Sequence, residues 1–405
     1  MLCHSFMRET AGNNQIVEVF VSQNGGQPPR PRFLSFPIDA PIQYHAFCDD
    51  FGPMNMSCTI RFIELLEQEL EACARASCDQ LVVSVEAGAR PLTNAIMLLG
   101  SYLIIKKDMA PDQVADCFAD IQPELLEDFR DATDLPADFG LTLRDCWDGL
   151  FQGKRCGWVG RPTHAGSPLW GAIDIEEYEH YDSPGNADLH QVVPGKLLAF
   201  RGPRDLGGGA LYADDGWTRR FSPAFLADTL PDLGVSDVVR LNEEAYDTRA
   251  LEAAGITHHA LVFPDCAEPP ATVVAAFLAV VDAARGAVAV HCKAGLGRTG
   301  TLVAVWMMRS RGFTARAAMG WLRVMRPGSV IGAQQGFLCR VQRIREAQAA
   351  ARRAGQPASA RRGPSPAAPV RSGVAAAAAA AATAAAQVSA ALDRQSAARM
   401  LARRD

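Results

Sequence analysis

Residues 290–300 read Val-His-Cys-Lys-Ala-Gly-Leu-Gly-Arg-Thr-Gly, and the rest of the chain is best interpreted outward from this stretch. The apolar residues 287–290 before it predict a strand, and residues 301–309 after it predict a helix. A Gly-rich turn between a strand and a helix N-terminus binds anions, because free backbone N–H groups and the positive end of the helix dipole face the turn. The stretch therefore predicts a phosphate-binding loop.

Two side chains of this loop predict chemistry as well as binding. Cys292 begins the loop, where backbone N–H donors favour the thiolate, which is the nucleophilic form of cysteine. Arg298 follows with a planar guanidinium that matches two oxygens of a phosphate. Gly295 and Gly297 allow positive φ and close backbone approach. A buried cysteine in a Gly-rich turn is the alternative, and the full string of residues 291–300 favours a nucleophile that holds phosphate.

The string His-Cys-Lys-Ala-Gly-Leu-Gly-Arg-Thr-Gly resembles the signature of the cell division cycle 14 dual-specificity protein phosphatases. The resemblance extends over residues 33–345 and includes residues 50–55, 177–181, 193–196, 238–242, 258–259 and 326–335. It implies an α/β fold with two tandem phosphatase-like domains, each a central sheet flanked by helices, of which the C-terminal one is catalytic. It also implies a reaction through a cysteinyl-phosphate intermediate.

An internal echo of the loop occurs near the N-terminus. Residues 82–90 read Val-Val-Ser-Val-Glu-Ala-Gly-Ala-Arg before a helical pattern, and Val85 stands where Cys292 stands in the later unit. With the resemblance, this echo indicates a phosphatase-like domain that lacks a nucleophile and serves substrate binding. Two unrelated strand–loop–helix units of an α/β chain are the alternative.

Composition and periodicity predict the order of the parts. We expect a flexible N-terminal arm (1–32) with a short strand at 16–21, a non-catalytic substrate-binding domain (33–202), a linker (203–222), a catalytic domain (223–350) and a disordered Ala/Arg/Pro tail (351–405). Helices are predicted at 56–74, 94–105, from Pro111, and at 243–254, 271–284, 298–309, 314–325 and 334–350. Strands are predicted at 81–85, 237–241, 256–263 and 287–290.

Thiolate attack on phosphorus requires an acid that protonates the leaving oxygen. Asp265 is the candidate, because it lies in a Pro-Asp turn after a predicted strand, 27 residues before the nucleophile (292 − 265), where the family has its general acid. His291 is expected to orient the loop, and Thr299 to donate its hydroxyl to the cysteine sulfur. By resemblance Gln334 positions the attacking water, with Gln335 as the alternative.

Substrate binding is predicted at the loop and at a set of acidic residues. The loop residues that would bind the phosphoryl group are Lys293, Ala294, Gly295, Leu296 and Gly297, and the lysine adds positive charge at the rim. Phosphoinositide 3-phosphatases carry a second lysine where this chain has leucine, which favours a phosphoprotein substrate. Family members favour phosphoserine followed by proline and a downstream basic residue, and Glu179, Asp182 and Asp214 match acidic positions of their groove. A solvated acidic surface is the alternative.

Composition limits the remaining classes of function. A chain of 405 residues with 48% hydrophobic and 21% charged residues is typical of a globular protein, and a net charge of −5 disfavours nucleic-acid binding by bulk charge. No metal or other cofactor is expected, because the 11 cysteines and eight histidines lack ligand spacing. Unpaired cysteine spacing favours a reducing intracellular compartment, and the absence of an apolar run of about 20 residues argues against membrane insertion.

Three functions are open from the sequence. The favoured one is a dual-specificity protein phosphatase of the cell cycle, active in mitotic exit or cytokinesis, for which the resemblance implies nuclear, cytoplasmic and spindle or centrosome locations. The second is a phosphatase of phosphoinositides or RNA 5′ ends, and the third is a silent phosphopeptide-binding module. Retention of Cys292, Arg298 and Asp265 favours an enzyme. The oligomeric state is not predicted.

Overall fold

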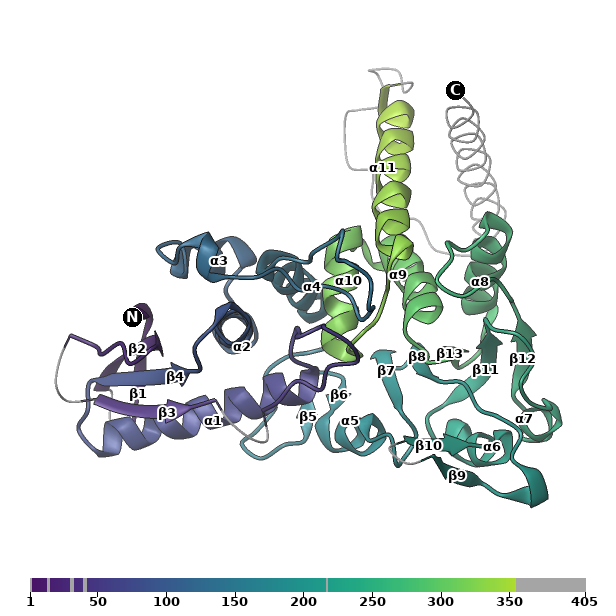
Figure 1. Cartoon of the computed structure of the whole chain (residues 1–405), viewed down its shortest axis with the longest axis horizontal. Coiled ribbons are helices and arrows are strands. Elements are labelled where there is room, and N and C mark those ends of the chain that lie inside the picture. Colours follow the sequence, from purple (N-terminus) through teal and green to yellow (C-terminus); the bar gives the residue numbers. More distant parts are fainter. Residues whose placement is uncertain (1, 13–14, 30–32, 39–41, 216–217, 355–405) are drawn as a thin grey trace, which may run out of the picture. The chain divides into compact units, whose positions relative to one another are not determined.

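The computed structural model describes residues 2–12, 15–29, 33–38, 42–215 and 218–354, which fall into two compact units (Figure 1). Unit 1 comprises Met1–Pro194 and Arg316–Gly332, and unit 2 comprises Gly195–Ala315 and Ala333–Asp405. Most of the predicted tail, from residue 355 on, lies outside the described residues, so its predicted disorder stays a prediction.

Unit 1 is built on a sheet with the strand order β1-β2-β4-β3. Its strands are β1 (Leu2–Ala11), β2 (Gln15–Gln23), β3 (Phe33–Pro37), β4 (Gln80–Val85), β5 (Leu169–Trp170), β6 (Ile173–Asp174) and β7 (Leu189–Val193). Its helices are α1 (Met56–Arg75), α2 (Ala89–Lys107), α3 (Pro111–Cys117), η1 (Pro123–Leu125), α4 (Leu143–Arg155), α5 (Ile175–Asp182) and, except for its first residue, α10 (Ala315–Met325). Helices α1 and α2 both pack against β2 and β4 of this sheet and also contact each other.

The capping and burial of these helices follow from their sequences. Asn55 caps α1, because its side chain accepts a hydrogen bond from the Cys58 backbone N–H at 2.8 Å. Every residue of α2 from Leu92 to Ile105 is buried, which explains why this helix is apolar all round rather than amphipathic. The predicted helices at 56–74 and 94–105 are confirmed, although α2 begins five residues earlier than predicted (94 − 89).

The N-terminal residues are not an arm, contrary to prediction. Strand β1 pairs antiparallel with β2, and β2 pairs parallel with β4, so both belong to the sheet of unit 1. Val17, Val19 and Val21 are fully buried. The predicted strand at 16–21 is confirmed as part of β2, and the Gly and Pro residues at 25–29 lie in an irregular segment after β2 ends at Gln23.

Helix α10 also lies outside the domain to which the sequence assigned it. Residues 314–325 were predicted to be helical within the catalytic domain, whereas residues 316–332 belong to unit 1. Glycines of α4 allow the close approach, because a Cβ at Gly149 would lie 2.4 Å from the Ala317 carbonyl oxygen and one at Gly153 would lie 2.2 Å from the Trp321 ring. The Trp321 indole N–H donates to the Val192 carbonyl at 2.8 Å.

Unit 2 contains a parallel sheet with the order β12-β11-β13-β8. Its strands are β8 (Leu197–Arg201), β9 (Tyr212–Asp215), β10 (Thr218–Phe221), β11 (Val235–Arg240), β12 (Thr257–Ala260) and β13 (Ala287–Cys292). Its helices are η2 (Gly207–Gly209), α6 (Pro223–Asp232), α7 (Arg249–Ala253), α8 (Ala271–Ala283), α9 (Gly297–Arg311) and α11 (Ala333–Ala354). Helices α8, α9 and α11 lie on one side of the sheet and α6 on the other (Figure 1).

Two sequence predictions for unit 2 need correction. Strand β8 was placed in the first domain and residues 203–222 in a linker, but β8 pairs with β13, and β9 and β10 form a hairpin within unit 2. The predicted helix at 243–254 is reduced to α7, because Asp247 turns the chain by accepting a bond from the Arg249 backbone N–H at 3.0 Å. The remaining predicted helices and strands are present in unit 2 with shifted ends.

Candidate active site

The predicted phosphate loop lies between β13 and α9. All residues of β13 are buried, and α9 begins at Gly297 with no side chain capping its first turn. Gly295 has φ +72°, and a Cβ there would lie 2.0 Å from the Phe200 carbonyl oxygen of β8. Only glycine fits this position, which brings the loop against the neighbouring strand. The uncapped N–H groups of α9 are therefore available to an anion.

Arg298 is buried, and one nitrogen of its guanidinium donates hydrogen bonds to backbone carbonyls. The side chain is 1% exposed, and its Nη1 donates to the carbonyls of Phe263 at 2.9 Å and Leu241 at 3.3 Å. Its Nε lies 3.2 Å from Asp265 Oδ1, but the two atoms do not meet at a hydrogen-bonding angle. The arrangement fixes the direction of the guanidinium with neutral acceptors, so its charge is not cancelled by a buried carboxylate.

Two buried donors of the loop have no hydrogen-bond partner within the described part of the chain. They are the Arg298 Nε–H and the Thr299 hydroxyl. The predicted hydrogen bond from Thr299 to the Cys292 sulfur is therefore not formed in this structure. A buried polar group left without a partner costs about 1–3 kcal/mol, so such groups are rare outside functional sites. A phosphoryl group has the acceptor oxygens that these donors lack, and the residues present therefore fit the predicted ligand.

The segment that carries Asp265 also contacts Gln334. The Asp265 side chain is 56% exposed, and its Oδ1 accepts a bond from the Cys266 backbone N–H at 3.0 Å. Gln334 is buried at the start of α11 and donates through Nε2 to the Ala267 carbonyl at 3.2 Å. The structure thus brings the predicted acid, the predicted water-positioning residue and Arg298 together. Gln335 is also buried.

His291 is fully buried and points away from solvent. Its Nδ1 lies 3.0 Å from the Cys292 carbonyl oxygen, and its Nε2 lies 2.8 Å from the hydroxyl of Tyr246. Burial lowers the pKa of His291 to about 3, so the ring is neutral near pH 7. A neutral ring cannot supply charge to the thiolate, and its contacts support the predicted role in orienting the loop.

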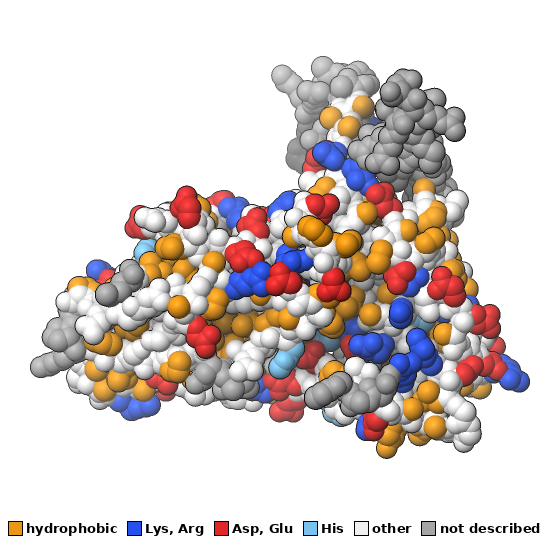
Figure 2. All heavy atoms as spheres, in the orientation of Figure 1, with side chains coloured by type: hydrophobic (Ala, Val, Ile, Leu, Met, Phe, Trp, Pro, Cys, Tyr) orange, Lys and Arg blue, Asp and Glu red, His pale blue; other side chains and the backbone are white. Residues whose placement is uncertain are grey.

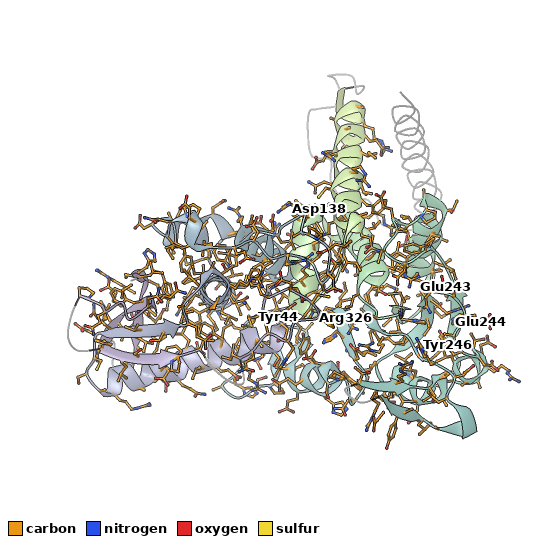
Figure 3. The ribbon with its side chains drawn as sticks, viewed as in Figure 1. Tyr44, Asp138, Glu243, Glu244, Tyr246 and Arg326 are labelled. Atoms are coloured by element: carbon orange, nitrogen blue, oxygen red, sulfur yellow. The ribbon has the colours of Figure 1, made fainter. Side chains whose placement is uncertain are left out.

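Tyr246 is a residue that the sequence interpretation missed. It lies in the segment between β11 and α7 (labelled in Figure 3) and is 3% exposed. The prediction of a helix over 243–254 hid it, because a helical pattern gives no reason to expect one tyrosine to turn inward. The sequence offered no local signal for it, because its partners His258 and His291 lie on other strands.

The remaining loop residues differ in their exposure to solvent. Lys293 is exposed, Ala294 is half-buried, and Leu296 is 9% exposed. Figure 2 shows Lys and Arg side chains gathered over the sheet of unit 2. Positive charge of this kind attracts dianionic phosphate esters.

The two predicted groove residues of unit 1 have partners. Glu179 accepts two bonds from Arg61, through Nε at 2.8 Å and Nη2 at 2.6 Å, and these bonds hold the pKa of Glu179 below its usual range. Asp182 lies 2.7 Å from His190 Nε2 and accepts a bond from Asn55 at 3.2 Å. Both carboxylates are about one-third exposed, so each retains a face toward solvent.

Asp214 lies in unit 2, on the β9–β10 hairpin. It is exposed and pairs with Arg219 across the hairpin at 2.7 Å, and this bond lowers the pKa of Asp214. Three acidic residues acting as one groove stay a prediction, because two of them lie in unit 1 and one in unit 2.

Metal and membrane features were searched within the described ranges. No three His, Cys, Asp or Glu side chains there are grouped so as to hold a metal ion. None of the described helices combines the length and the apolar character needed to cross a membrane.

Comparison with known proteins gives two family matches. Residues 16–153 match the family described as dual specificity protein phosphatase, N-terminal half, and residues 222–312 match the DSP-PTPase phosphatase of polymorphic toxin systems. The first match includes β2, which agrees with the correction made above for the N-terminal residues.

Curated relatives match most of the chain. Dual specificity protein phosphatase CDC14C of Symphalangus syndactylus is 32% identical over 76% of this chain and 62% of its own length. Dual specificity protein phosphatase CDC14A of Homo sapiens is 34% identical over 75% of this chain and 48% of its own. Tyrosine-protein phosphatase cdc-14 of Caenorhabditis elegans is 35% identical over 76% and 42%.

The chain thus spans roughly half the length of these relatives. The fold is accordingly two phosphatase-like α/β units in tandem, of which the second carries the loop at Cys292. Over about three quarters of its length, the chain belongs to the family of CDC14 dual specificity protein phosphatases.

Proposed function

We propose that this protein is a cysteine-dependent dual-specificity phosphatase that hydrolyses phosphoserine, phosphothreonine and phosphotyrosine in proteins. The observation that carries the proposal is the placement of Arg298 Nε, which is buried, without a hydrogen-bond partner in the described residues, and 3.2 Å from Asp265 Oδ1. This placement supports the proposal, because a donor suited to a phosphoryl oxygen lies beside the candidate proton donor Asp265.

The first half of the reaction transfers the phosphoryl group to sulfur. The Cys292 thiolate attacks phosphorus, a sulfur–phosphorus bond forms, and the bond from phosphorus to the ester oxygen breaks. Asp265 gives its proton to that leaving oxygen, which departs as the alcohol of serine, threonine or tyrosine. Arg298 and the N–H groups at the start of α9 bind the phosphoryl oxygens, where negative charge is held through the transition state.

The second half returns the thiolate. A water molecule attacks phosphorus, the sulfur–phosphorus bond breaks, and Asp265, now ionised, accepts the proton of the water. Gln334 is suited to position this water, because it bonds to the Ala267 carbonyl in the segment that carries the acid. The Thr299 hydroxyl, which has no partner in the described part of the chain, is available to stabilise the departing sulfur. The products are the alcohol and inorganic phosphate.

The substrate preference forms a finer part of the proposal. Leu296 at the loop does not add the second cation that a polyanionic lipid headgroup would favour. We propose that the preferred site is phosphoserine followed by proline, with a downstream basic residue that contacts Glu179, Asp182 and Asp214. A role in mitotic exit or cytokinesis, in the nucleus and cytoplasm or at the spindle or centrosome, belongs to the same proposal and draws on the resemblance of residues 290–300 to the family signature.

The test is a paired assay of the wild type and Cys292→Ser in the presence of EDTA. Each is given a phosphoserine-proline peptide with a downstream lysine, a phosphotyrosine peptide and a phosphoinositide. Metal-independent turnover of the peptides that the substitution abolishes is the expected result. Turnover of the lipid alone would move the chain to phosphoinositides, and binding of phosphopeptides without any turnover would make it a reader.

The acid is tested separately with Asp265→Asn. We expect kcat for phosphoserine and phosphotyrosine peptides to fall by about 10²–10⁴-fold, because the amide cannot protonate the leaving oxygen. An aryl ester with a good leaving group needs less protonation and should lose less. Equal losses for all leaving groups would contradict the role given to Asp265.

The acidic groove is tested with Glu179→Gln against Glu64→Gln. Both carboxylates pair with Arg61, Glu64 through Nη1 at 3.0 Å, so both substitutions remove one carboxylate partner of that arginine. Only Glu179→Gln should raise KM for the lysine-containing peptide, and neither should change turnover of a small aryl phosphate. The same rise in both variants would assign the effect to Arg61 rather than to a groove.

A further inference from the structure

We propose that Tyr246 is a positioning residue that, together with His258, fixes the tautomer of His291 and so the orientation of the first peptide of the phosphate loop. The kinetic part of this proposal rests on the proposed phosphatase function. Three rings from separate segments form the arrangement: His258 on β12, Tyr246 before α7 and His291 on β13.

The direction of each hydrogen bond follows from the one group that can only accept. The Cys292 carbonyl oxygen lies 3.0 Å from His291 Nδ1, so this nitrogen must carry the proton of the neutral ring. The other nitrogen, Nε2, is then an acceptor, and the Tyr246 hydroxyl at 2.8 Å must donate to it. The phenol oxygen is left to accept from His258 Nε2, which lies 3.2 Å away.

The charged and titratable groups around His291 support a neutral ring. After burial, His258 of β12, Arg240 of β11 and Arg298 of α9 each lower the pKa of His291, and only the bond to the Cys292 carbonyl raises it. The pKa of His258 is itself lowered, first by burial and then by Arg240 and His259. A neutral His258 has one N–H, which is what the bond to Tyr246 requires.

The consequence for the loop follows from the planar trans peptide. The carbonyl of Cys292 and the N–H of Lys293 belong to one peptide and point in opposite directions. When His291 holds the carbonyl, it also sets the direction of the first backbone N–H after the nucleophile. Gly202 leaves room for this contact, because a Cβ there would lie 2.3 Å from the Cys292 oxygen and 2.7 Å from His291 Nδ1.

Loss of the Tyr246 hydroxyl removes the group that donates a hydrogen bond to His291 Nε2. The ring can then take the other tautomer, in which an Nδ1 lone pair faces the carbonyl lone pairs of Cys292 and the contact becomes repulsive. The peptide is released to rotate, and the thiolate loses a fixed neighbouring donor. Tyr246 therefore acts on the nucleophile through His291, without touching substrate.

The experiment compares Tyr246→Phe with Tyr178→Phe in the full chain. Tyr178 is also buried, and its hydroxyl donates to the Met325 carbonyl at 2.9 Å within unit 1, so the control loses a similar bond elsewhere. Nitrogen NMR of ¹⁵N-histidine-labelled protein reports which ring nitrogen is protonated, and the His291 signal is identified by its absence in His291→Gln. Turnover of a small aryl phosphate is measured across pH.

In the wild type we expect His291 to show a protonated Nδ1 and a bare Nε2. Tyr246→Phe should alter that signal, lower kcat/KM by about 3- to 10-fold, as loss of one hydrogen bond allows, and move the acid limb of the pH profile to higher pH. Tyr178→Phe should do none of these. His258→Gln, whose amide can donate to the phenol oxygen, should retain more activity than His258→Leu.

Two results would overturn the proposal. One is an unchanged His291 signal in Tyr246→Phe, and the other is an unchanged pH profile despite lower activity, which would mean general destabilisation, as judged by the melting temperatures of both Phe variants. The NMR measurement does not depend on turnover. An inactive wild type with the expected His291 signal would refute the phosphatase function but support the proposed hydrogen bonds among His258, Tyr246 and His291.

Discussion

Each unit contains a parallel strand that leads through a glycine turn into a buried helix, and only one of these two strands ends at a cysteine. In unit 2, β13 ends at Cys292 and α9 begins at Gly297, whereas in unit 1, β4 ends at Val85 and α2 begins at Ala89. The first turn has four residues, 293–296, and the second has three, 86–88. The shorter turn has fewer backbone N–H donors for an anion.

The arginines of the two junctions differ in their partners. Arg298 is held by the carbonyls of Leu241 and Phe263, which are neutral acceptors. Arg90 is held by two carboxylates, those of Asp49 at 2.8 Å and Glu127 at 3.0 Å. Carboxylates occupy the donors of Arg90 and cancel its charge, so an anionic ligand would have to displace them. A phosphate site therefore requires an arginine that is not paired with carboxylates, as much as it requires the turn.

The largest expected effect comes from exchanging the arginines for lysine. Arg298→Lys should lower kcat/KM by about 10²–10³-fold, because a lysine cannot span the carbonyls and still offer a second donor to a phosphoryl oxygen. Arg90→Lys should leave turnover unchanged, because its charge already lies between two carboxylates. The measurement is steady-state hydrolysis of an aryl phosphate by both variants, and equal losses would remove the distinction between the junctions.

The sequence predicts those parts of the site that depend on residues close together in the chain. The strand, the loop and the helix follow from residues close together in the chain, and the structure confirms them. The structure also places Asp265 Oδ1 3.2 Å from Arg298 Nε, while its role as the acid stays a prediction. Tyr246 could not be found in this way, because its partners His258 and His291 lie on other strands. A hydrogen bond between distant segments leaves no periodicity in the sequence.

The division into units was harder to predict for the same reason. Helix α10 follows α9 in the chain, yet it packs in unit 1, where Gly149 and Gly153 leave room for its backbone and for the Trp321 ring. Strand β8 was assigned to the first domain because it precedes the glycines at 207–209, although it pairs with β13. Assignment of an element to a unit is set by its packing partner and not by its neighbour in sequence.

A smaller effect is expected when the turn glycines are replaced by alanine. Gly295→Ala puts a Cβ 2.0 Å from the Phe200 carbonyl oxygen at φ +72°, and should cost about 2–4 kcal/mol of stability as well as activity. Gly88 has φ +124° but its Cβ would meet nothing nearer than Pro91 at 3.5 Å, so Gly88→Ala should cost about 1–2 kcal/mol and no activity. Chemical denaturation measures the first quantity and the aryl phosphate assay the second. Equal losses of stability would show that the backbone angle, and not the contact with β8, makes glycine necessary.

The smallest expected effect is that of Val85→Cys in a Cys292→Ser background, for which we expect no gain of phosphatase activity. This variant gives the junction of unit 1 a thiol at the position of the nucleophile, and so asks whether the cysteine is the only thing that junction lacks. We expect no turnover of any phosphate ester, because the turn is one residue shorter and Arg90 remains bound to Asp49 and Glu127. Adding Asp49→Asn and Glu127→Gln frees the arginine and tests the turn alone. Turnover by the first variant would mean that a thiol is sufficient. Turnover only after the two carboxylates are also replaced would mean that Asp49 and Glu127 prevent catalysis in unit 1. No turnover by either variant would mean that the length of the turn decides which unit is an enzyme.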